Sequence, residues 1–148
     1  MSELGINLEQ SDSTQQFELL SRGTSENKEY CYVRARTNIE AKRVVTLQDG
    51  RASELSVNND GGTGIGLAIY NIDANDYGWV QIWGNGEVRA RANCAANATL
   101  YAQSNANAGQ VDDSAVSGSK PISGMALSSA AGGSGADTAC YLFYPTIA

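Results

Sequence analysis

The chain has 148 residues, of which 16 are acidic, 10 are basic and none is histidine. The net charge of −6 argues against a protein that binds nucleic acid or a membrane surface, because such proteins carry basic patches. The lack of histidine excludes a Ser-His-Asp or Cys-His catalytic site within this chain and removes the most common metal ligand.

Large apolar side chains are scarce. Leu, Ile, Val and Phe account for 28 of the 148 residues, and much of the 42% hydrophobic content is alanine. Because burial energy scales with apolar area, small side chains contribute little each. We therefore expect one folded domain with a lean core, which oligomerisation or docking on a larger surface would stabilise.

Residues 1–29 differ in composition from the rest of the chain. Scattered apolar side chains lie among polar and acidic ones, and Leu4, Ile6 and Leu8 recur at every second position, as in an extended segment. The stretch 13–20 has the composition of one or two helical turns. We expect an N-terminal arm that orders only against a partner; the alternative is an ordinary first strand followed by a loop.

From Tyr30 onward the sequence has the pattern of β-strands. Residues 30–37 alternate between two sets that a strand directs to opposite faces: Cys31, Val33 and Ala35 on one face, and Tyr32, Arg34 and Arg36 on the other. Farther along, Asp49-Gly50 separates two apolar stretches, a pattern typical of a hairpin turn.

The middle of the chain continues with short strands and turns. Residues 64–72 form an apolar run that begins with glycine, and the polar residues 73–76 after it predict a turn. Residues 77–92 form the longest strand-like stretch and contain Asn85-Gly86, the strongest short-range signal for a hairpin. We therefore expect the chain to reverse direction at Asn85-Gly86.

The C-terminal part supplies the remaining strands, in residues 98–103, 121–129 and 138–148. About nine short strands with turn signals at intervals of roughly 8–12 residues are typical of a β-sandwich or a small barrel. The predicted fold is therefore all-β and antiparallel. It comprises a single domain over residues 30–148, with the N-terminal arm, residues 1–29, outside it.

A six-residue pattern occurs twice in the chain. Residues 33–38 read VRARTN and residues 88–93 read VRARAN, and weaker matches follow, such as WVQIW at 79–83 with CYLFY at 140–144. Repeats of this kind indicate an internal duplication. We expect two similar halves that close on each other: residues 31–84 and residues 86–144.

No sequence motif indicates enzyme, cofactor or metal chemistry. The glycine-rich stretch 61–66 lacks the Lys-Ser/Thr ending of a phosphate-binding loop and leads into a strand. The acidic stretches 73–76 and 112–113 lack the ligand spacing of a calcium loop, which favours a role as turn residues. We expect no catalytic residues, no cofactor and no metal, and therefore no enzyme activity.

The three cysteines, Cys31, Cys94 and Cys140, lie far apart and form no CxxC pair. An odd number of widely spaced cysteines favours reduced thiols in a protein made in the cytoplasm. We expect Cys31 and Cys140, which lie in strand-like runs, to act as small core side chains.

The stretch 77–84 is the richest in aromatic residues. On a strand, Tyr77, Trp79 and Trp83 share one face, and Val80 and Ile82 share the other. If Val80 and Ile82 face the core, the tryptophans face outward and suggest an interface between subunits or a sugar-binding strip. In the opposite register the tryptophans belong to the core. Both alternatives stay open at this point.

The repeated pattern also places four arginines on matching faces of matching strands: Arg34, Arg36, Arg89 and Arg91. The simplest interpretation is that they are solvated or paired with the abundant carboxylates. The alternative is a docking face for a partner.

Residues 65–88, IGLAIYNIDANDYGWVQIWGNGEV, and residues 135–148, GADTACYLFYPTIA, carry a resemblance. They are similar to strands of head decoration (cement) proteins of tailed phages, and the likeness extends over residues 30–148. The resemblance implies a β-sandwich or barrel-like fold and an N-terminal arm that lies on the capsid. It also implies trimers at capsomer junctions, with the major capsid protein as partner, on the exterior of a virion assembled in the host cytoplasm. The three cysteines depart from the family pattern.

The resemblance implies two sets of contact residues. The capsid-binding arm would use its apolar side chains: Leu4, Ile6, Leu8, Phe17 and Leu20. The homo-oligomer interface would use the aromatic strip: Tyr77, Trp79 and Trp83. Two alternatives remain, namely a carbohydrate-binding β-sandwich module that stacks sugars on Trp79 and Trp83, and a tail or fibre component.

Overall fold

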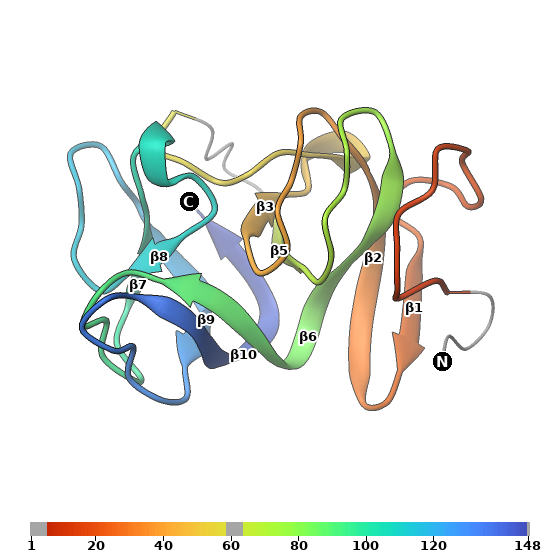
Figure 1. The fold of residues 1–148 in the computed structure, drawn as a ribbon. Coiled ribbons are helices and arrows are strands. Elements are labelled where there is room, and N and C mark those ends of the chain that lie inside the picture. Colours follow the sequence, from red (N-terminus) through yellow and green to blue (C-terminus); the bar gives the residue numbers. More distant parts are fainter. Residues whose placement is uncertain (1–5, 59–63, 148) are drawn as a thin grey trace.

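The computed structural model describes residues 6–58 and 64–147 and confirms an all-β fold (Figure 1). Leu4 of the expected arm and residues 61–63 of the glycine-rich stretch lie outside the described residues. The strands are β1 (Arg22–Ser25), β2 (Lys28–Ala35), β3 (Val44–Thr46), β4 (Arg51–Ala52), β5 (Ile65–Ala68), β6 (Tyr77–Ala90), β7 (Leu100–Ala102), β8 (Val111–Asp112), β9 (Pro121–Leu127) and β10 (Ala136–Ile147). Two short 3-10 turns accompany them: η1 (Gln48–Gly50) and η2 (Asn105–Asn107). No helical segment within the described ranges has the length and apolar character required for crossing a bilayer.

The C-terminal half of the chain closes into a five-stranded barrel. Its strands are bonded in the cyclic order β6-β10-β9-β7-β8, and the ring closes where β8 pairs with β6. That closing contact is parallel and joins Ala90 to Val111, whereas the other four pairings are antiparallel. The barrel therefore needs no long parallel strands, only one short parallel contact.

The strands outside the barrel pair around the first half of β6 in the same order in which the barrel strands pair around its second half. β2 pairs with β6, β6 with β5, β5 with β3, and the short β4 pairs with β2 in parallel. A single bridge from Val45 to Glu54, just after β4, links β3 back to this strand. Figure 1 shows the two groups side by side, with β6 running through both.

The repeated VRAR pattern occupies corresponding positions in the two groups. The Arg36 N–H donates to the carbonyl of Ala52 at 2.7 Å, and the Arg91 N–H donates to the carbonyl of Val111 at 2.8 Å. The ladders continue the correspondence, because Cys31 lies opposite Val80 and Gly86 lies opposite Cys140. Val80 therefore occupies the position in the first group that Cys140 occupies in the second. The sequence comparison, which aligned residues 79–83 with 140–144, paired Val80 with Tyr141 instead. The duplication itself stays a prediction.

The chain does not reverse at Asn85-Gly86, so the predicted hairpin there is wrong. β6 continues through these residues and bends instead (Figure 1). Gly84 adopts a φ of +101°, which suits glycine, and the buried Gln81 amide donates to the carbonyls of Trp83 and Asn85 at 3.1 and 2.9 Å. At the bend β6 changes partner from β2 to β10, and this non-local pairing overrides the local turn signal.

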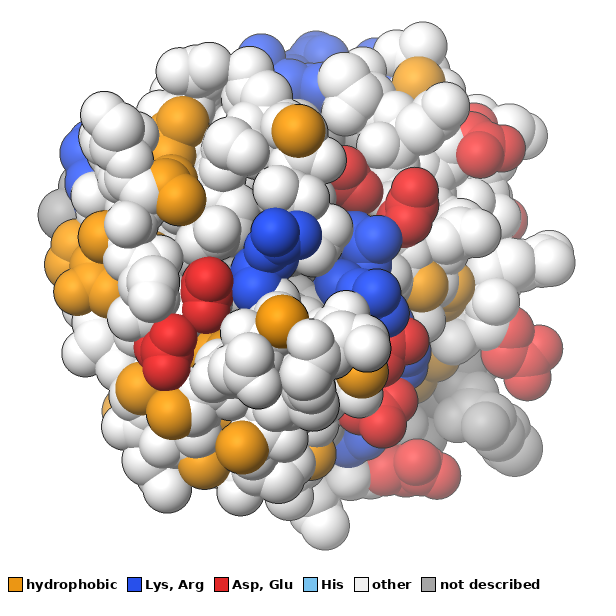
Figure 2. Space-filling model, turned by 60° about the vertical axis from the view of Figure 1, so that its left-hand side comes forward, with side chains coloured by type: hydrophobic (Ala, Val, Ile, Leu, Met, Phe, Trp, Pro, Cys, Tyr) orange, Lys and Arg blue, Asp and Glu red, His pale blue; other side chains and the backbone are white. Residues whose placement is uncertain are grey.

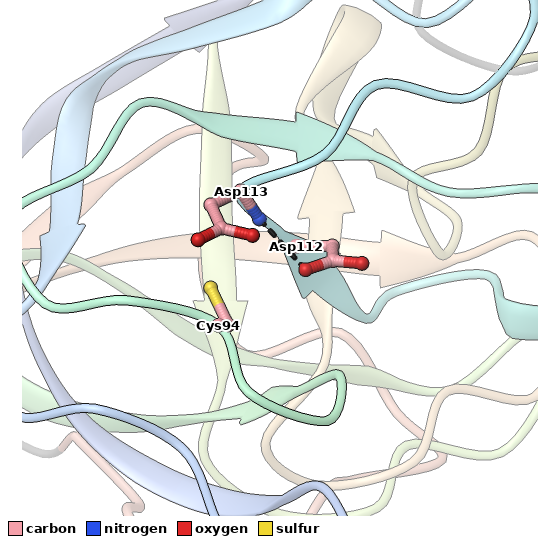
Figure 3. Close-up of side chains that lie close together, drawn as sticks. All are labelled: Cys94, Asp112 and Asp113. Atoms are coloured by element: carbon pink, nitrogen blue, oxygen red, sulfur yellow. Dashed lines mark hydrogen bonds between the residues drawn. The ribbon is translucent and has the colours of Figure 1, made fainter. Parts of the chain in front are cut away.

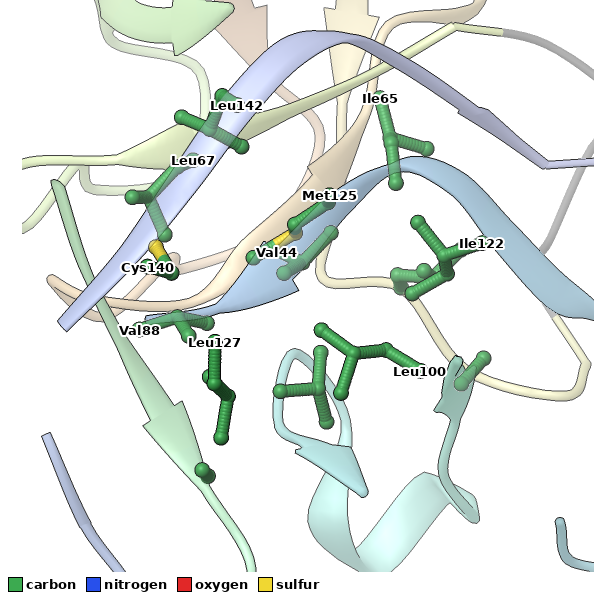
Figure 4. Close-up of a cluster of buried hydrophobic side chains, with 14 of the residues drawn as sticks. Val44, Ile65, Leu67, Val88, Leu100, Ile122, Met125, Leu127, Cys140 and Leu142 are labelled. Carbon is green, nitrogen blue, oxygen red and sulfur yellow. The ribbon is translucent and has the colours of Figure 1, made fainter. Parts of the chain in front are cut away.

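Leucine, isoleucine and valine form most of the two main clusters of the core, with alanine and cysteine at most of the remaining positions. One cluster fills the barrel and extends onto β5, and it includes Leu67, Leu100, Leu127, Leu142 and Cys140 (Figure 4). The other lies under β2 and the first half of β6, and includes Cys31, Val33 and Ala35, as the alternation predicts. All three cysteines are buried and free, which confirms the expectation of unpaired thiols.

The N-terminal segment, residues 6–20, packs on its own domain, so the prediction of a separate arm is wrong for this part of the chain. Ile6 is buried, and the ring of Phe17 lies 5.4 Å from Tyr32 and 5.2 Å from Trp79 between centroids. Backbone bonds join the Leu20 N–H to the Tyr32 carbonyl at 2.7 Å. The physical reason is that this segment covers an aromatic surface of β2 and β6 that would otherwise face water. The domain boundary at residue 30 also fails, because β1 and β2 form a hairpin over residues 22–35.

Candidate interaction surface

Three large aromatic side chains, Trp83, Tyr141 and Phe143, form an exposed group that we call the aromatic patch. Their exposed fractions are 37%, 41% and 65%. Phe143 lies opposite Trp83 in the β6–β10 ladder, and Tyr141 lies two residues before Phe143 on the same strand face. The alternate residues of β10, Cys140 and Leu142, point into the barrel, which forces Tyr141 and Phe143 outward. Exposed aromatic groups of this kind often mark interaction sites.

A bulge in β10 exposes a further aromatic residue, Tyr144. The register between β10 and β9 shifts between Leu142 and Thr146, and Tyr144 has a φ of +47°. A positive φ is unfavourable for a bulky residue, and bulges often redirect side chains at functional sites. Gly124 permits the bulge, since a Cβ there would lie 2.6 Å from the Phe143 carbonyl oxygen. The exposed fraction of Tyr144 is 42%.

Polar contacts hold Tyr144 in this position. Its hydroxyl donates to Glu29 Oε2 at 2.6 Å, and Glu29 Oε1 lies 3.3 Å from Arg22 Nη1. The Arg22 guanidinium lies 5.4 Å from the centre of the Tyr144 ring. The hydrogen bond to the Glu29 carboxylate raises the pKa of Tyr144, so the phenol stays protonated and keeps donating.

An open groove of about 610 Å³ lies beside these contacts. We call it the turn groove, because Trp83 and Tyr144 line it together with residues 24–29 of the β1–β2 turn. Glu26 and Asn27 form the tip of this turn, with φ angles of 52° and 64°. The surface therefore combines an aromatic patch with an adjoining groove that has both aromatic and polar walls.

The predicted aromatic strip is divided between the core and the surface. Trp79 is only 3% exposed and lies in the core beneath the N-terminal segment, which settles the two sequence alternatives for this residue. Tyr77 is half-buried and stacks on Tyr32 with 6.1 Å between ring centres. Trp83 is exposed because it lies at the bend of β6, beyond the covering segment. The structure thus does not present Trp79 for a subunit contact.

The predicted arm residues are similarly divided. Ile6 is buried, Leu8 and Phe17 are half-buried, and Leu20 is 45% exposed. Leu20 lines a second, apolar groove with Tyr144 and other residues. Of the arm residues within the described ranges, Leu20 has the largest exposed fraction, whereas Ile6 packs in the domain's own core.

The four repeated arginines lie in different local surroundings, and the side chains of two of them, Arg34 and Arg91, have local partners. Arg34 Nε donates to the Asn75 carbonyl at 3.2 Å and its guanidinium lies 5.4 Å from the Tyr77 ring centre. Arg91 donates to the Asn107 side chain at 3.0 Å. Arg36 lines a polar groove beside η2, and Arg89 is half-buried on β6. Figure 2 shows basic side chains grouped on one face with acidic ones on both sides, so this face has no strong single sign of charge.

Cys94, Asp112 and Asp113 form the one cluster of potential metal ligands found among the described residues, with candidate ligand atoms within 4.8 Å of one another (Figure 3). Local bonds already use the carboxylates: Asp113 accepts from the Ala95 N–H at 2.9 Å, and Asp112 accepts from the Asp113 N–H at 2.8 Å. Burial, with the nearby Asp113 and Asp112 charges, raises the pKa of the Cys94 thiol to about 11, whereas metals bind the thiolate. Asp112 ends strand β8 and Asp113 lies in the bend after it, so the predicted turn role fits Asp113 but not Asp112.

Sequence reasoning missed Tyr141, Phe143 and Tyr144 as site residues. The run YLFY at 141–144 shows the aromatic content, but the bulge that exposes two consecutive rings has no signal in the sequence. No protein-family model matches the chain, and no curated protein matches its sequence, so a function must be argued from this surface.

Proposed function

We propose that the chain is a structural virion protein that decorates the outer capsid surface of a tailed phage. In this role it binds the major capsid protein, bridges neighbouring subunits and stabilises the assembled shell. The observation that carries the proposal is the aromatic patch, because exposed aromatic residues are enriched at the centres of protein interfaces. The resemblance of residues 65–88 and 135–148 to phage decoration proteins supplies the class of partner.

The structure changes which residues we assign to the contact. The apolar side chains of the N-terminal segment largely pack on the domain itself, so they contribute less to the capsid than the sequence suggests. Tyr141 and Phe143 project from a barrel strand, where both are paired with β6. A contact on a rigid strand loses less conformational entropy on binding than a contact made by an arm that must first become ordered.

The mechanism is stabilisation by mass action. A protein that binds only the assembled lattice shifts the equilibrium toward that lattice, by an amount set by its concentration relative to its dissociation constant. We propose a trimer of three 15.6 kDa chains at each junction, in which the patch of each chain meets a neighbouring chain or the shell. A lean core is consistent with this role, because the contacts on the shell supplement the stability of the domain.

Two matched substitutions distinguish the patch from the arm as the contact. Phe143→Ser removes the most exposed aromatic side chain, and Leu20→Ser removes the exposed apolar side chain of the N-terminal segment. We expect Phe143→Ser to weaken binding to capsids of the cognate phage by roughly tenfold or more, as for a central interface residue. Leu20→Ser should change it by less than about threefold.

The measurement is co-sedimentation of each full-length variant with purified capsids, with circular dichroism as the control for folding. If Leu20→Ser weakens binding more than Phe143→Ser does, the N-terminal segment rather than the patch makes the main contact with the capsid. Unchanged occupancy for both variants would contradict the assignment of the patch.

A further inference from the structure

The turn groove is built by two irregularities in neighbouring ladders. The β2–β6 register shifts between Glu29 and Tyr30, and the β9–β10 register shifts between Leu142 and Thr146. The first shift lies beside Trp83, which is opposite Glu29, and the second exposes Tyr144. Bulges are enriched where a fold redirects side chains toward a ligand. Two bulges that border one groove therefore point to a functional arrangement.

The aromatic wall of the groove is pre-organised. The hydrogen bond from Tyr144 to Glu29 and the Glu29–Arg22 ion pair fix the ring, and Arg22 also lies over the ring face. The positive φ of Tyr144 stores strain that the surrounding structure maintains. A side chain held in its binding conformation loses little entropy when a ligand arrives.

The chemistry of the lining selects the ligand class. Trp83 and Tyr144 offer aromatic faces, Thr24 and Asn27 offer a hydroxyl and an amide, and Glu29 is neutralised by Arg22. The remaining charges, on Glu26 and Lys28, are opposite in sign, so the groove does not favour an ion of either charge. A flat apolar face combined with a rim of hydroxyl groups is the surface of a pyranose sugar.

We propose that the turn groove binds a neutral saccharide, with a pyranose ring stacked on Trp83 and its hydroxyls bonded to the β1–β2 turn. This site differs from the strip that the sequence suggested, because Trp79 is buried and Tyr144 replaces it. The inference does not depend on capsid binding, since the isolated protein carries the complete groove. A negative result for saccharide binding therefore does not contradict the proposed capsid binding, and the converse also holds.

The test uses the full chain with its tryptophan indoles labelled with nitrogen-15. The chain has two tryptophans, so the exposed Trp83 reports on the groove and the buried Trp79 serves as an internal control. The probes are cellotetraose, maltotetraose, mannotetraose and chitotetraose, each added up to about 10 mM, which covers weak single-site binding. We expect at least one probe to shift the Trp83 signal saturably while the Trp79 signal stays in place. No shift of Trp83 with any of the four would overturn the proposal.

Two variants locate the site, and their affinities are measured by isothermal titration calorimetry, because Trp83→Ala removes the indole that reports binding in the labelled chain. Trp83→Ala should weaken binding of the active probe by about tenfold or more, whereas Tyr141→Ala, an exposed aromatic outside the groove, should leave it unchanged within about twofold. Affinity that survives Trp83→Ala would overturn the location.

Discussion

Replacing Trp79 with alanine is expected to lower the free energy of unfolding by about 3–5 kcal/mol, the range for a fully buried aromatic side chain. Trp79 is 3% exposed, and its ring centre lies 5.2 Å from that of Phe17 and 5.0 Å from that of Tyr32. Its removal would leave a cavity between the N-terminal segment and the β2–β6 sheet. Urea denaturation followed by circular dichroism measures the loss.

Trp83→Ala is the matched control, because the chain has only these two tryptophans and Trp83 is 37% exposed. It should cost less than about 1 kcal/mol, as exposed substitutions usually do. Hydrogen exchange adds a local measurement: in Trp79→Ala the Leu20 amide, bonded to the Tyr32 carbonyl, should lose protection before the barrel does. Equal losses for the two variants would contradict the packing of the N-terminal segment described above.

Alkaline conditions are expected to destabilise the fold by a few kcal/mol between about pH 9 and pH 12, through the buried thiols. Burial is the main cause that raises the pKa of Cys31 from 9.0 to about 11 and that of Cys140 from 9.0 to about 12. Unfolded thiols ionise near pH 9, whereas the folded ones remain protonated, so rising pH favours the unfolded chain. The stabilisation is complete below pH 9 and disappears as the pH approaches the folded values. Each pKa unit corresponds to about 1.4 kcal/mol.

The control for this prediction is the double variant Cys31→Ala/Cys140→Ala. It lacks two of the three buried thiols, so its free energy of unfolding should fall less steeply with pH than that of the wild type. Part of the dependence should persist, because burial also raises the pKa of the Cys94 thiol to about 11 and that of Tyr70 to about 12. An equal slope in the variant and the wild type would show that Cys31 and Cys140 are not the cause.

Local patterns in the sequence predict much of the fold. The alternation at residues 31–36 correctly places Cys31, Val33 and Ala35 in one core cluster. It gives no sign that Tyr32, on the other face of the strand, is buried as well, because the N-terminal segment that covers it is distant in the chain. The Asp49-Gly50 signal also corresponds to a real turn, with both residues at positive φ in η1. These features depend on residues close together in the chain.

The features that the sequence does not predict depend on contacts between distant segments. Asn85-Gly86 reads as a hairpin, but β6 exchanges β2 for β10 there and continues. Trp79 and Trp83 have the same local pattern, and only the fold of residues 6–20 over one of them makes one buried and the other exposed. Tyr144 belongs to the candidate site through a bulge opposite Gly124, about 20 residues earlier in the chain, a pairing that no local signal specifies.

The aromatic patch also offers a source of stability that the isolated domain, with its lean core, lacks. Leucine, isoleucine and valine form most of the two main core clusters, and the alanine and cysteine side chains at most of the remaining positions gain less from burial. Exposed aromatic area on Trp83, Tyr141 and Phe143 is then available for burial in a complex. The account thus predicts that the protein is more stable on its partner than alone.

The most direct test of the proposed decoration role is the binding of the wild-type protein to purified capsids of its own phage, measured by co-sedimentation over a range of protein concentrations. The account predicts saturable binding to the assembled capsid, with little binding to unassembled capsid protein. Equal binding to both forms would contradict a contact that bridges neighbouring subunits of the shell. No binding to the assembled capsid would contradict the proposed function itself.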